Sequence, residues 1–500
     1  MLSELLPGHQ ELPELLVEGI TNDSRLVNSG DLFFAMPGLR VDGRSYIADA
    51  KARNAAGILC ESPGPGVEVG IPVVAVKNLR ASVGDIAGRF YGNPSEDLLV
   101  VAITGTNGKT SCSHFIAQAL SGLGARCGVI GTMGYGAIVA GNAAKGAQSL
   151  SLKNSGSGKD LTTPDPIVLQ EYLANLVSDA CSAVALEASS HGLEQGRLNG
   201  IQIDVAVFTN MTRDHLDYHA DFESYQKSKQ QLFAWESLKT AIVNRDDEFG
   251  RRLCSSIGKG VEVFSVSTSS SEADINGKDI QFHDDGLSFS VCSPWGEAKV
   301  RSTLMGRFNV QNLLSTLGVI CSQGYALEEA VSVISEIGMV KGRMEVIRNP
   351  GQPTVVIDYA HTPDALDKAL QATKEHCRGE LWCVFGCGGD RDTGKRPLMG
   401  EVASTHAGHV VITDDNPRSE SSADIASEII RGVVAGSYVE VETDRRSAIW
   451  NTLSNAGCGD VVLIAGKGHE EYQEVAGKRL AFSDHEVVDD YVSEHVSGGQ

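Results

Sequence analysis

Long apolar runs and paired cysteines are both missing from this 500-residue chain. No run approaches the ~18 apolar residues of a membrane-spanning helix, and the 11 cysteines include no Cys-x-x-Cys pair. The first segment, Met1 to Leu16, carries Glu4, Glu11 and Glu14 and lacks the cationic start of a secretory signal peptide. These absences predict a cytoplasmic protein that keeps its thiols reduced and does not insert into a membrane.

An excess of positive charge is missing as well. The chain carries 42 Lys and Arg against 64 Asp and Glu, a formal net charge of −22. This balance gives no electrostatic footprint for nucleic acid or for an anionic membrane surface. Local basic pockets for small anionic ligands stay compatible with it, so the expected partners are small molecules.

Chain length and hydrophobic pattern predict an α/β protein of three domains, since one domain takes up ~150 residues. Residues 1–97 form a first, small block. Residues 98–341 alternate short apolar strands with helical stretches, as in a parallel sheet, and a period-two pattern between residues 280 and 300 predicts a β-hairpin. Residues 342–500 repeat the alternation and predict a Rossmann-like, doubly wound domain. The Gly- and Ser-rich residues 141–160 predict a flexible loop.

The most specific motif lies at residues 104–110, between an apolar strand and a helical pattern. Its glycines allow backbone N–H groups to approach phosphate oxygens at a helix N-terminus. Lys109 would reach the outer phosphates of a nucleotide, and the Thr110 hydroxyl would hold Mg²⁺. The spacing G-x-x-G-K-T is two residues shorter than the usual motif, and Ile103 stands where its first glycine is expected. The match is therefore either accidental or typical of a separate class of ATP-using proteins.

Polar side chains follow several other predicted strands. Glu187 could hold Mg²⁺ beside the nucleotide, or its loop could simply cap a helix. His215 and His219 have a spacing typical of metal ligands, but no glutamate follows His215, so the zinc-protease pattern is not met. Lys229 taken alone is typical of a solvated helix face. The turn at 415–418 could present Arg418 to a carboxylate or a phosphate, or be an ordinary Asn-Pro turn.

Together these motifs resemble the Mur ligases, ATP-dependent amide-forming enzymes of bacterial cell-wall precursor synthesis. The resemblance covers essentially the whole chain, and G-x-x-G-K-[ST] is the form of the phosphate motif that this family uses. It implies a UDP-binding domain (1–97), a central ATPase domain (98–341) and a C-terminal amino-acid-binding domain (342–500). The motifs that carry it are Asp23-Ser24-Arg25, Gly105–Thr110, Glu187–Gly192, Arg213–His219, Met305–Asn312, Gly342–Glu345, Asp358–Pro363, the loop 386–399, Asp415–Arg418 and Gly466–Glu470.

The resemblance also implies roles for individual residues. A UDP-muramoyl-dipeptide would contact Asn22, Ser24, Leu39, Arg40, Val41, Thr162, Thr163, Ser189, Gln195 and Arg197. ATP would contact Gly105, Thr106, Asn107, Gly108, Lys109, Thr110, Ser111, Asn309, Arg343 and Asp358. Mg²⁺ would be held by Thr110, Glu187, His215 and Lys229, the last as a carbamate. The catalytic residues would be Lys109, Glu187, His215 and Lys229. The incoming amino acid would contact Arg391, Asp415, Asn416, Pro417, Arg418, Gly466 and Glu470.

The reaction implied by the resemblance is the activation of a carboxylate by ATP. The γ-phosphate moves to the free side-chain carboxylate of the D-glutamyl residue, and the acyl phosphate is attacked by the amine of meso-2,6-diaminopimelate. Arg418 would pair with the distal carboxylate, which lysine lacks, and Glu470 with the neighbouring ammonium. The resemblance implies a monomeric enzyme.

Three alternatives stay open. The acceptor could be L-lysine, or the chain could be a folylpolyglutamate synthetase-like ligase, or it could be a nucleotide-binding regulatory protein without chemistry. The block before residue 98 and the 415–418 motif argue against the second. The presence of Lys109, Glu187, His215 and Lys229 argues against the third.

Overall fold

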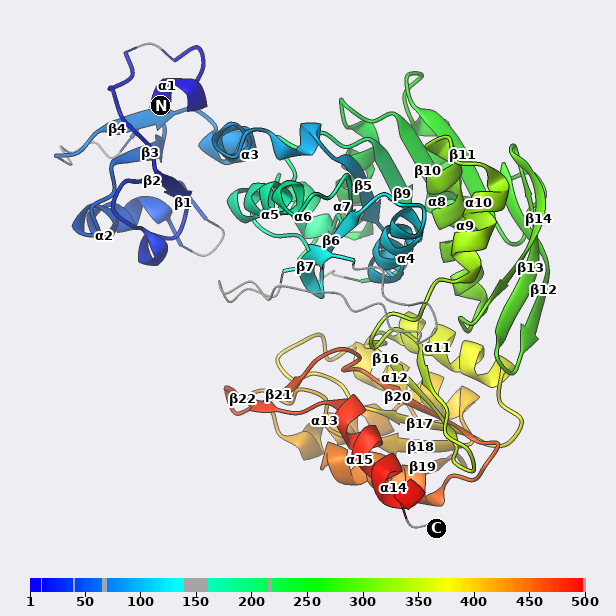
Figure 1. The fold of residues 1–500 in the computed structure, drawn as a ribbon. Coiled ribbons are helices and arrows are strands. Elements are labelled where there is room, and N and C mark those ends of the chain that lie inside the picture. The colour runs from blue at the N-terminus through cyan, green and yellow to red at the C-terminus, as the bar shows by residue number, and fades with distance from the viewer. Residues whose placement is uncertain (10, 39–40, 65–69, 139–160, 215–217, 498–500) are drawn as a thin grey trace.

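The computed structural model describes residues 1–497 except residues 10, 39–40, 65–69, 139–160 and 215–217. The loop predicted at 141–160 therefore lies outside the described residues. Three sheets follow one another along the chain, each with its own helices (Figure 1). Within the described ranges, no helix is both long and apolar enough to cross a membrane.

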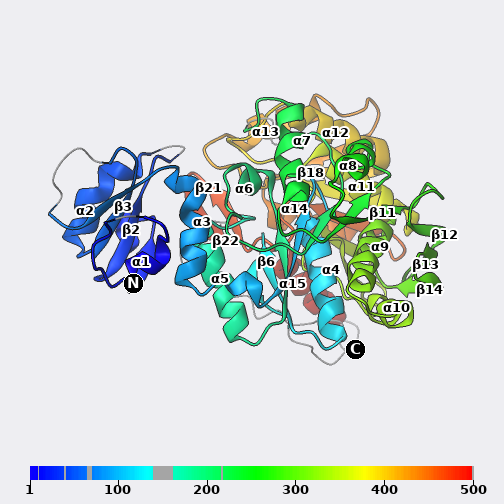
Figure 2. The same cartoon turned by 90° about the horizontal axis from the view of Figure 1, so that it is seen from above.

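The N-terminal sheet is fully parallel, with its strands in the order of the chain. Its elements are α1 Leu2–Leu5, β1 Gly19–Thr21, β2 Asp31–Ala35, α2 Ile47–Ala52, β3 Gly57–Glu61, β4 Val73–Val76 and α3 Leu79–Phe90. Every residue of β2 is buried, because hydrophobic side chains cover both faces of the sheet. Figure 2 shows this unit beside the other two, with α3 next to α5. The approach is close, since a Cβ on Gly84 would lie 1.8 Å from the Asn199 carbonyl oxygen.

The central sheet has the strand order β14-β13-β12-β11-β10-β9-β5-β8-β6-β7. Its strands are β5 Leu99–Thr104, β6 Cys127–Gly131, β7 Gly134–Ala137, β8 Ala183–Glu187, β9 Val205–Phe208, β10 Thr240–Asn244, β11 Glu262–Ser267, β12 Ile275–His283, β13 Gly286–Ser293 and β14 Gly296–Ser302. The predicted hairpin is confirmed as β12 and β13, with Asp284 and Asp285 in the turn, and β14 extends it to three antiparallel strands.

Helices cover both faces of the central sheet. They are α4 Lys109–Gly122, α5 Pro166–Ser178, α6 Ser190–Glu194, α7 Phe222–Gln230, α8 Glu248–Ser256, α9 Arg307–Ser322 and α10 Leu327–Ser335. Val101 and Ile103 of β5 pack in one core with α4, α9 and α10, while Val100 and Ala102 pack with the helices of the other face. This alternation explains the continuous apolar run of β5, because a strand buried on both faces needs apolar residues at every position.

The C-terminal sheet has the order β15-β16-β20-β17-β18-β19 and is parallel except for β15. Its elements are β15 Glu345–Ile347, β16 Thr354–Asp358, α11 Pro363–Glu375, β17 Leu381–Phe385, α12 Lys395–His406, β18 His409–Ile412, α13 Ser422–Ile430, β19 Tyr438–Val441, α14 Arg445–Asn455, β20 Val461–Ala465 and α15 Asp484–Ser497. A separate hairpin, β21 Tyr472–Val475 and β22 Lys478–Ala481, follows β20.

Helices α14 and α15 are joined by a fully buried ion pair. Arg445 donates from Nε and Nη2 to the two carboxylate oxygens of Asp484, at 2.7 and 2.8 Å, and neither side chain is exposed. A second pair on the same two helices, Arg446 with Asp490 at 2.7 Å, is about half exposed. The two pairs differ mainly in burial, so they form a natural comparison.

We expect Asp484→Asn to lower the free energy of unfolding by about 3 kcal/mol, because it leaves the Arg445 charge buried without its counterion. The matched change Asp490→Asn should cost less than about 1 kcal/mol, since water already solvates that pair. Urea unfolding of both variants measures the difference. Equal losses would show that burial does not set the strength of these pairs.

Candidate functional site

The glycine motif forms a cradle between β5 and α4. Gly105 and Gly108 have φ of +151° and +86°, values that residues other than glycine rarely adopt. A Cβ on Gly105 would lie 1.9 Å from Thr209 Oγ1. Lys109 Nζ folds back over the loop and donates to the carbonyls of Gly105 and Thr106, both at 2.9 Å. The backbone N–H groups at the start of α4 and this lysine together favour a bound anion.

Residues after β9 hold the cradle in shape. Thr209 Oγ1 donates to the Asn107 carbonyl at 2.6 Å, and Asn210 Oδ1 accepts from the Asn107 backbone N–H at 3.0 Å. Thr106 Oγ1 lies 3.0 Å from the Tyr225 hydroxyl. The loop is therefore fixed before any ligand arrives, which reduces the entropy lost on binding.

Glu187 lies at the end of β8, next to the cradle, and its side chain is buried. Its Oε2 accepts from the Thr110 hydroxyl at 3.1 Å, and its Oε1 accepts from the Thr132 backbone N–H at 3.0 Å. Arg343, which lies just before β15 of the C-terminal sheet, donates to the Thr110 hydroxyl at 3.2 Å. Carboxylate and hydroxyl oxygens thus meet where a hard cation would sit beside a phosphate.

Lys229 is not on a solvated helix face, as it would be from its sequence context alone. It is about 1% exposed, on α7, and its Nζ donates to the Gly105 carbonyl at 2.8 Å. The same nitrogen lies 4.7 Å from the centre of the Tyr225 ring. Burial, together with the nearby Lys109 charge, lowers the pKa of Lys229 well below its ordinary value. The pKa of Lys109 is also lowered, chiefly by burial.

A cleft of about 330 Å³ lies between the cradle and the C-terminal domain. Asn107, Gly108 and Ser111 line it on one side, with Arg343 and Asp358 on the other. The Arg343 guanidinium lies over the Tyr359 ring, 4.5 Å from its centre. Burial raises the pKa of Asp358, which Arg343 counteracts. Asn107 Nδ2 also donates to Asp364 of α11 at 2.9 Å, so the cradle contacts both domains.

A second, larger cleft of about 620 Å³ lies between the N-terminal sheet and the central domain. Asn22 lines it from one side and Tyr172 from the other. Deeper in the central domain, Thr163 Oγ1 lies 3.0 Å from Ser189 Oγ, and Arg197 donates to the Thr163 carbonyl at 2.7 Å. These polar groups are connected to Glu187, because Thr163 also donates to the Glu187 carbonyl at 2.7 Å.

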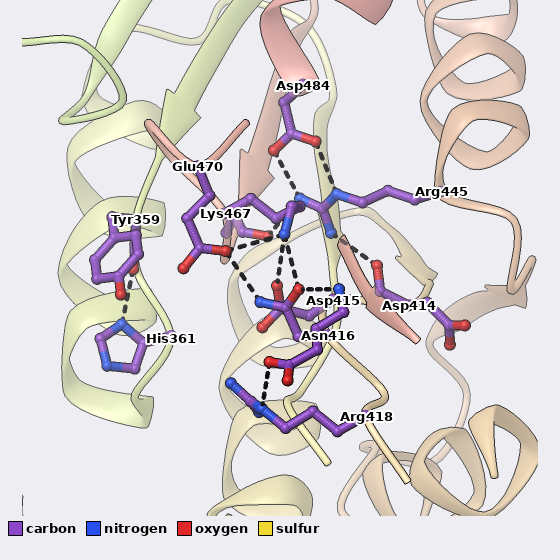
Figure 3. A network of polar contacts seen from close by, with 12 residues as sticks. Tyr359, His361, Asp414, Asp415, Asn416, Arg418, Arg445, Lys467, Glu470 and Asp484 are labelled. Carbon is purple, nitrogen blue, oxygen red and sulfur yellow. Dashed lines mark hydrogen bonds and ion pairs between the residues drawn. The ribbon is translucent and has the colours of Figure 1, made fainter. Parts of the chain in front are cut away.

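The polar motifs after β18 and β20 meet in one cluster (Figure 3). Asn416 Nδ2 donates to Glu470 Oε2 at 3.0 Å, and Lys467 donates to that same oxygen at 3.0 Å. Lys467 is fully buried and also lies 3.8 Å from Asp415 Oδ1. Arg418, with φ of +51°, is directed to the other side of the turn and donates from Nε to Glu474 at 3.1 Å. The loop after β18 thus carries the Arg418 guanidinium, and the loop after β20 carries the Glu470 carboxylate.

The predicted site residues are not all placed alike. Leu39, Arg40 and His215 lie outside the described residues. Asn309 is buried behind Asn312, to whose amide its Oδ1 is bonded at 3.0 Å, and Asn312 is the one that lines the nucleotide cleft. Arg391 is exposed, and so is Val41. Their roles stay predictions.

Sequence reasoning missed three residues that the structure brings into these clusters. Thr132 follows β6 and bonds Glu187 through both its backbone N–H and its hydroxyl. Lys467 lies inside the Gly466–Glu470 motif, so that motif was the signal that could have indicated this buried residue. Glu474 had no signal in the sequence, because its contact with Arg418 spans 56 residues.

A phosphate cradle that faces a second α/β domain across a cleft defines a class of nucleotide-binding enzymes. Three family models match this chain: the Mur ligase family catalytic domain at residues 16–91, the Mur ligase middle domain at 103–320 and the Mur ligase glutamate ligase domain at 342–468. The chain belongs to the Mur ligase family.

Three of the similar proteins share a name. UDP-N-acetylmuramoyl-L-alanyl-D-glutamate--2,6-diaminopimelate ligase from Pseudomonas putida is 46% identical over 481 residues, 94% of this chain and 93% of that protein. The protein of the same name from Coxiella burnetii is 43% identical over 491 residues, 97% of each. A solved structure of a ligase with this name has a TM-score of 0.72 at 36% identity and covers 99% of both chains.

We expect Gly105→Ala to weaken nucleotide binding by about a hundredfold or more, since the added Cβ collides with Thr209 and the backbone at positive φ becomes strained. Gly258→Ala is the matched control, because a Cβ there meets nothing within 4 Å. Titration with a fluorescent ADP analogue gives both dissociation constants. Unchanged binding in Gly105→Ala would exclude the cradle as the phosphate site.

Proposed function

We propose that this chain is the ATP-dependent ligase that joins meso-2,6-diaminopimelate to UDP-N-acetylmuramoyl-L-alanyl-D-glutamate in the cytoplasm. The observation that carries the acceptor assignment is the cluster around Asn416. There Arg418 offers a guanidinium and Glu470 a carboxylate on one loop system. The distal end of diaminopimelate bears a carboxylate and an ammonium, so it needs one group of each sign.

The chain's own residues support transfer of a phosphoryl group to a carboxylate. Lys109 and the N-terminus of α4 would offset the charge of the outer phosphates. Arg343 lies against Thr110 and would join the C-terminal domain to the same phosphates. The D-glutamyl carboxylate would be oriented by Thr163, Ser189 and Arg197, which lie together beyond Glu187. Much of the rate gain would come from this positioning of substrates held by separate domains.

The oxygen donors fit a magnesium ion. Thr110 and Glu187 bring a hydroxyl and a carboxylate within 3.1 Å of each other, and such hard donors are the ligands that Mg²⁺ prefers. Thr110 and Glu187 would hold the ion, which would supply positive charge to offset the charge of the transferred phosphoryl group. An unmodified Lys229 is a poor ligand of this kind, because its ammonium offers no lone pair and its neutral amine is a nitrogen donor rather than an oxygen donor.

Lys229 is proposed to act as a carbamate. The reaction with CO₂ needs a neutral amine, and the lowered pKa of Lys229 keeps that amine neutral over more of the pH range than an exposed lysine. The neutral amine nitrogen would bond to the carbon of CO₂ and release one proton to solvent, so that a group crowded as a cation against Lys109 becomes an anion with two oxygens. That exchange relieves the like-charge repulsion and supplies ligands to the metal.

We expect ¹³CO₂ to give a carbamate NMR signal that disappears in Lys229→Met and persists in Lys227→Met. Lys227 is exposed and paired with Glu223 at 2.8 Å, which raises its pKa and keeps it protonated. The signal should fall as the pH is lowered through the pKa of Lys229, because the protonated amine cannot react. A signal retained in Lys229→Met would contradict the assignment.

The acceptor is tested by phosphate release with the UDP-muramoyl-dipeptide, ATP, and either diaminopimelate or lysine. We expect kcat/KM to favour diaminopimelate by roughly a hundredfold or more, since lysine lacks the distal carboxylate that would bond Arg418. Arg418→Ala should lower kcat/KM for diaminopimelate by roughly a hundredfold and change lysine turnover little. Equal turnover of both amino acids by the intact protein would refute the assignment, and ADP release without amide formation would point to a protein of another class.

A further inference from the structure

The arginine proposed to select diaminopimelate is already paired with a carboxylate of its own chain. Glu474 lies on β21, and the hairpin β21–β22 is attached to the recognition loop through the backbone. Arg418 N–H donates to the Glu474 carbonyl at 2.9 Å, and the Glu474 N–H donates to Asn416 Oδ1 at 2.9 Å. Val475 forms an isolated parallel β-bridge with Arg418. The position of Glu474 is thus set by bonds that do not involve its side chain.

The side-chain contact occupies part of the arginine's binding edge. Arg418 Nε donates to Glu474 Oε2 at 3.1 Å, and Nη1 donates to the Gly389 carbonyl at 2.8 Å. In the described part of the chain, Nη2 has no such bond. A carboxylate that approaches an arginine side-on uses Nε and Nη2 together. Glu474 therefore holds one of the two donors that a bidentate substrate carboxylate would take.

Both side chains remain reachable from solvent. Arg418 is 21% exposed and Glu474 is 30% exposed. An incoming carboxylate must either displace Glu474 from Nε or bind beside it as a like charge, and each route costs free energy. An incoming lysine has no carboxylate at this end, so the pair stays intact and Arg418 is not left without a counterion.

We propose that Glu474 is an internal counterion of Arg418. It weakens the binding of diaminopimelate and so lowers the ratio of kcat/KM for diaminopimelate over lysine. The inference rests on the proposed function, because it assumes that Arg418 receives the distal carboxylate. It makes Glu474 a specificity-determining residue that acts through Arg418. The opposite role, a support that orients the guanidinium for the substrate, predicts effects of opposite sign.

The test is steady-state phosphate release by the full-length enzyme at saturating ATP and UDP-muramoyl-dipeptide, with diaminopimelate or lysine varied. We expect Glu474→Gln to lower KM for diaminopimelate about three- to tenfold with kcat unchanged, since the competing charge is gone. The ratio of kcat/KM for diaminopimelate over lysine should rise by a similar factor. Glu474→Ala should shift both quantities in the same direction.

Glu486→Gln is the matched control, because it removes the same charge from an exposed position on α15. It should leave both amino acids' constants unchanged. Calorimetric titration of diaminopimelate into each variant provides a readout that does not depend on turnover. Both Glu474 variants keep the backbone bonds of the hairpin, so their fold is expected to persist, and thermal unfolding checks this.

The outcomes separate the two proposals. The wild-type enzyme can be active on diaminopimelate while both Glu474 variants show an unchanged or raised KM and dissociation constant for it. That result overturns the counterion role alone. A wild-type protein that shows no diaminopimelate-dependent phosphate release overturns the proposed function and this inference with it. A lower KM and a wider preference in both variants support the inference.

Discussion

The carbonyl oxygen of Gly105 is the point on which the site depends. It accepts hydrogen bonds from Lys109 and from Lys229, two side chains that come from different helices. Two lysine side-chain nitrogens lie beside one oxygen, and burial lowers the pKa of each. The site therefore disfavours two positive charges at once. Phosphate oxygens would relieve that instability at Lys109, and loss of the positive charge would relieve it at Lys229. The chemistry assigned to the two lysines follows from this single crowded contact.

The same cradle joins the central and C-terminal units. Asn107 bonds Asp364 of α11, and Thr110 accepts from Arg343 at the start of the third sheet. Between these contacts lies the cleft that suits a nucleotide. A ligand bound there touches both units at once, so its binding free energy can set their relative position. Amide formation needs that arrangement, because the amino acid and the carboxylate to be activated are proposed to bind to different units.

Much of the fold and part of the site could be predicted from local pattern. The continuous apolar run of β5 and the glycines after it are local signals, and so is the period-two pattern of β12 and β13. Each depends on neighbours within a few residues, which is the range over which side-chain periodicity and turn chemistry act. The resemblance to the Mur ligases added positions that no local pattern could assign, such as Lys229 and Asp358.

What the sequence by itself determined is a glycine-rich turn between a buried strand and a helix, a net charge of −22, and three successive α/β units. Only the tertiary structure decided that Lys229 is buried, because a helix face is exposed or buried depending on which elements pack against it. It alone placed Thr132 on Glu187 and Glu474 on Arg418, contacts that span 55 and 56 residues. The physical reason is that hydrogen bonds and ion pairs depend on distances of about 3 Å. Separation along the chain does not restrict those distances once the backbone has folded.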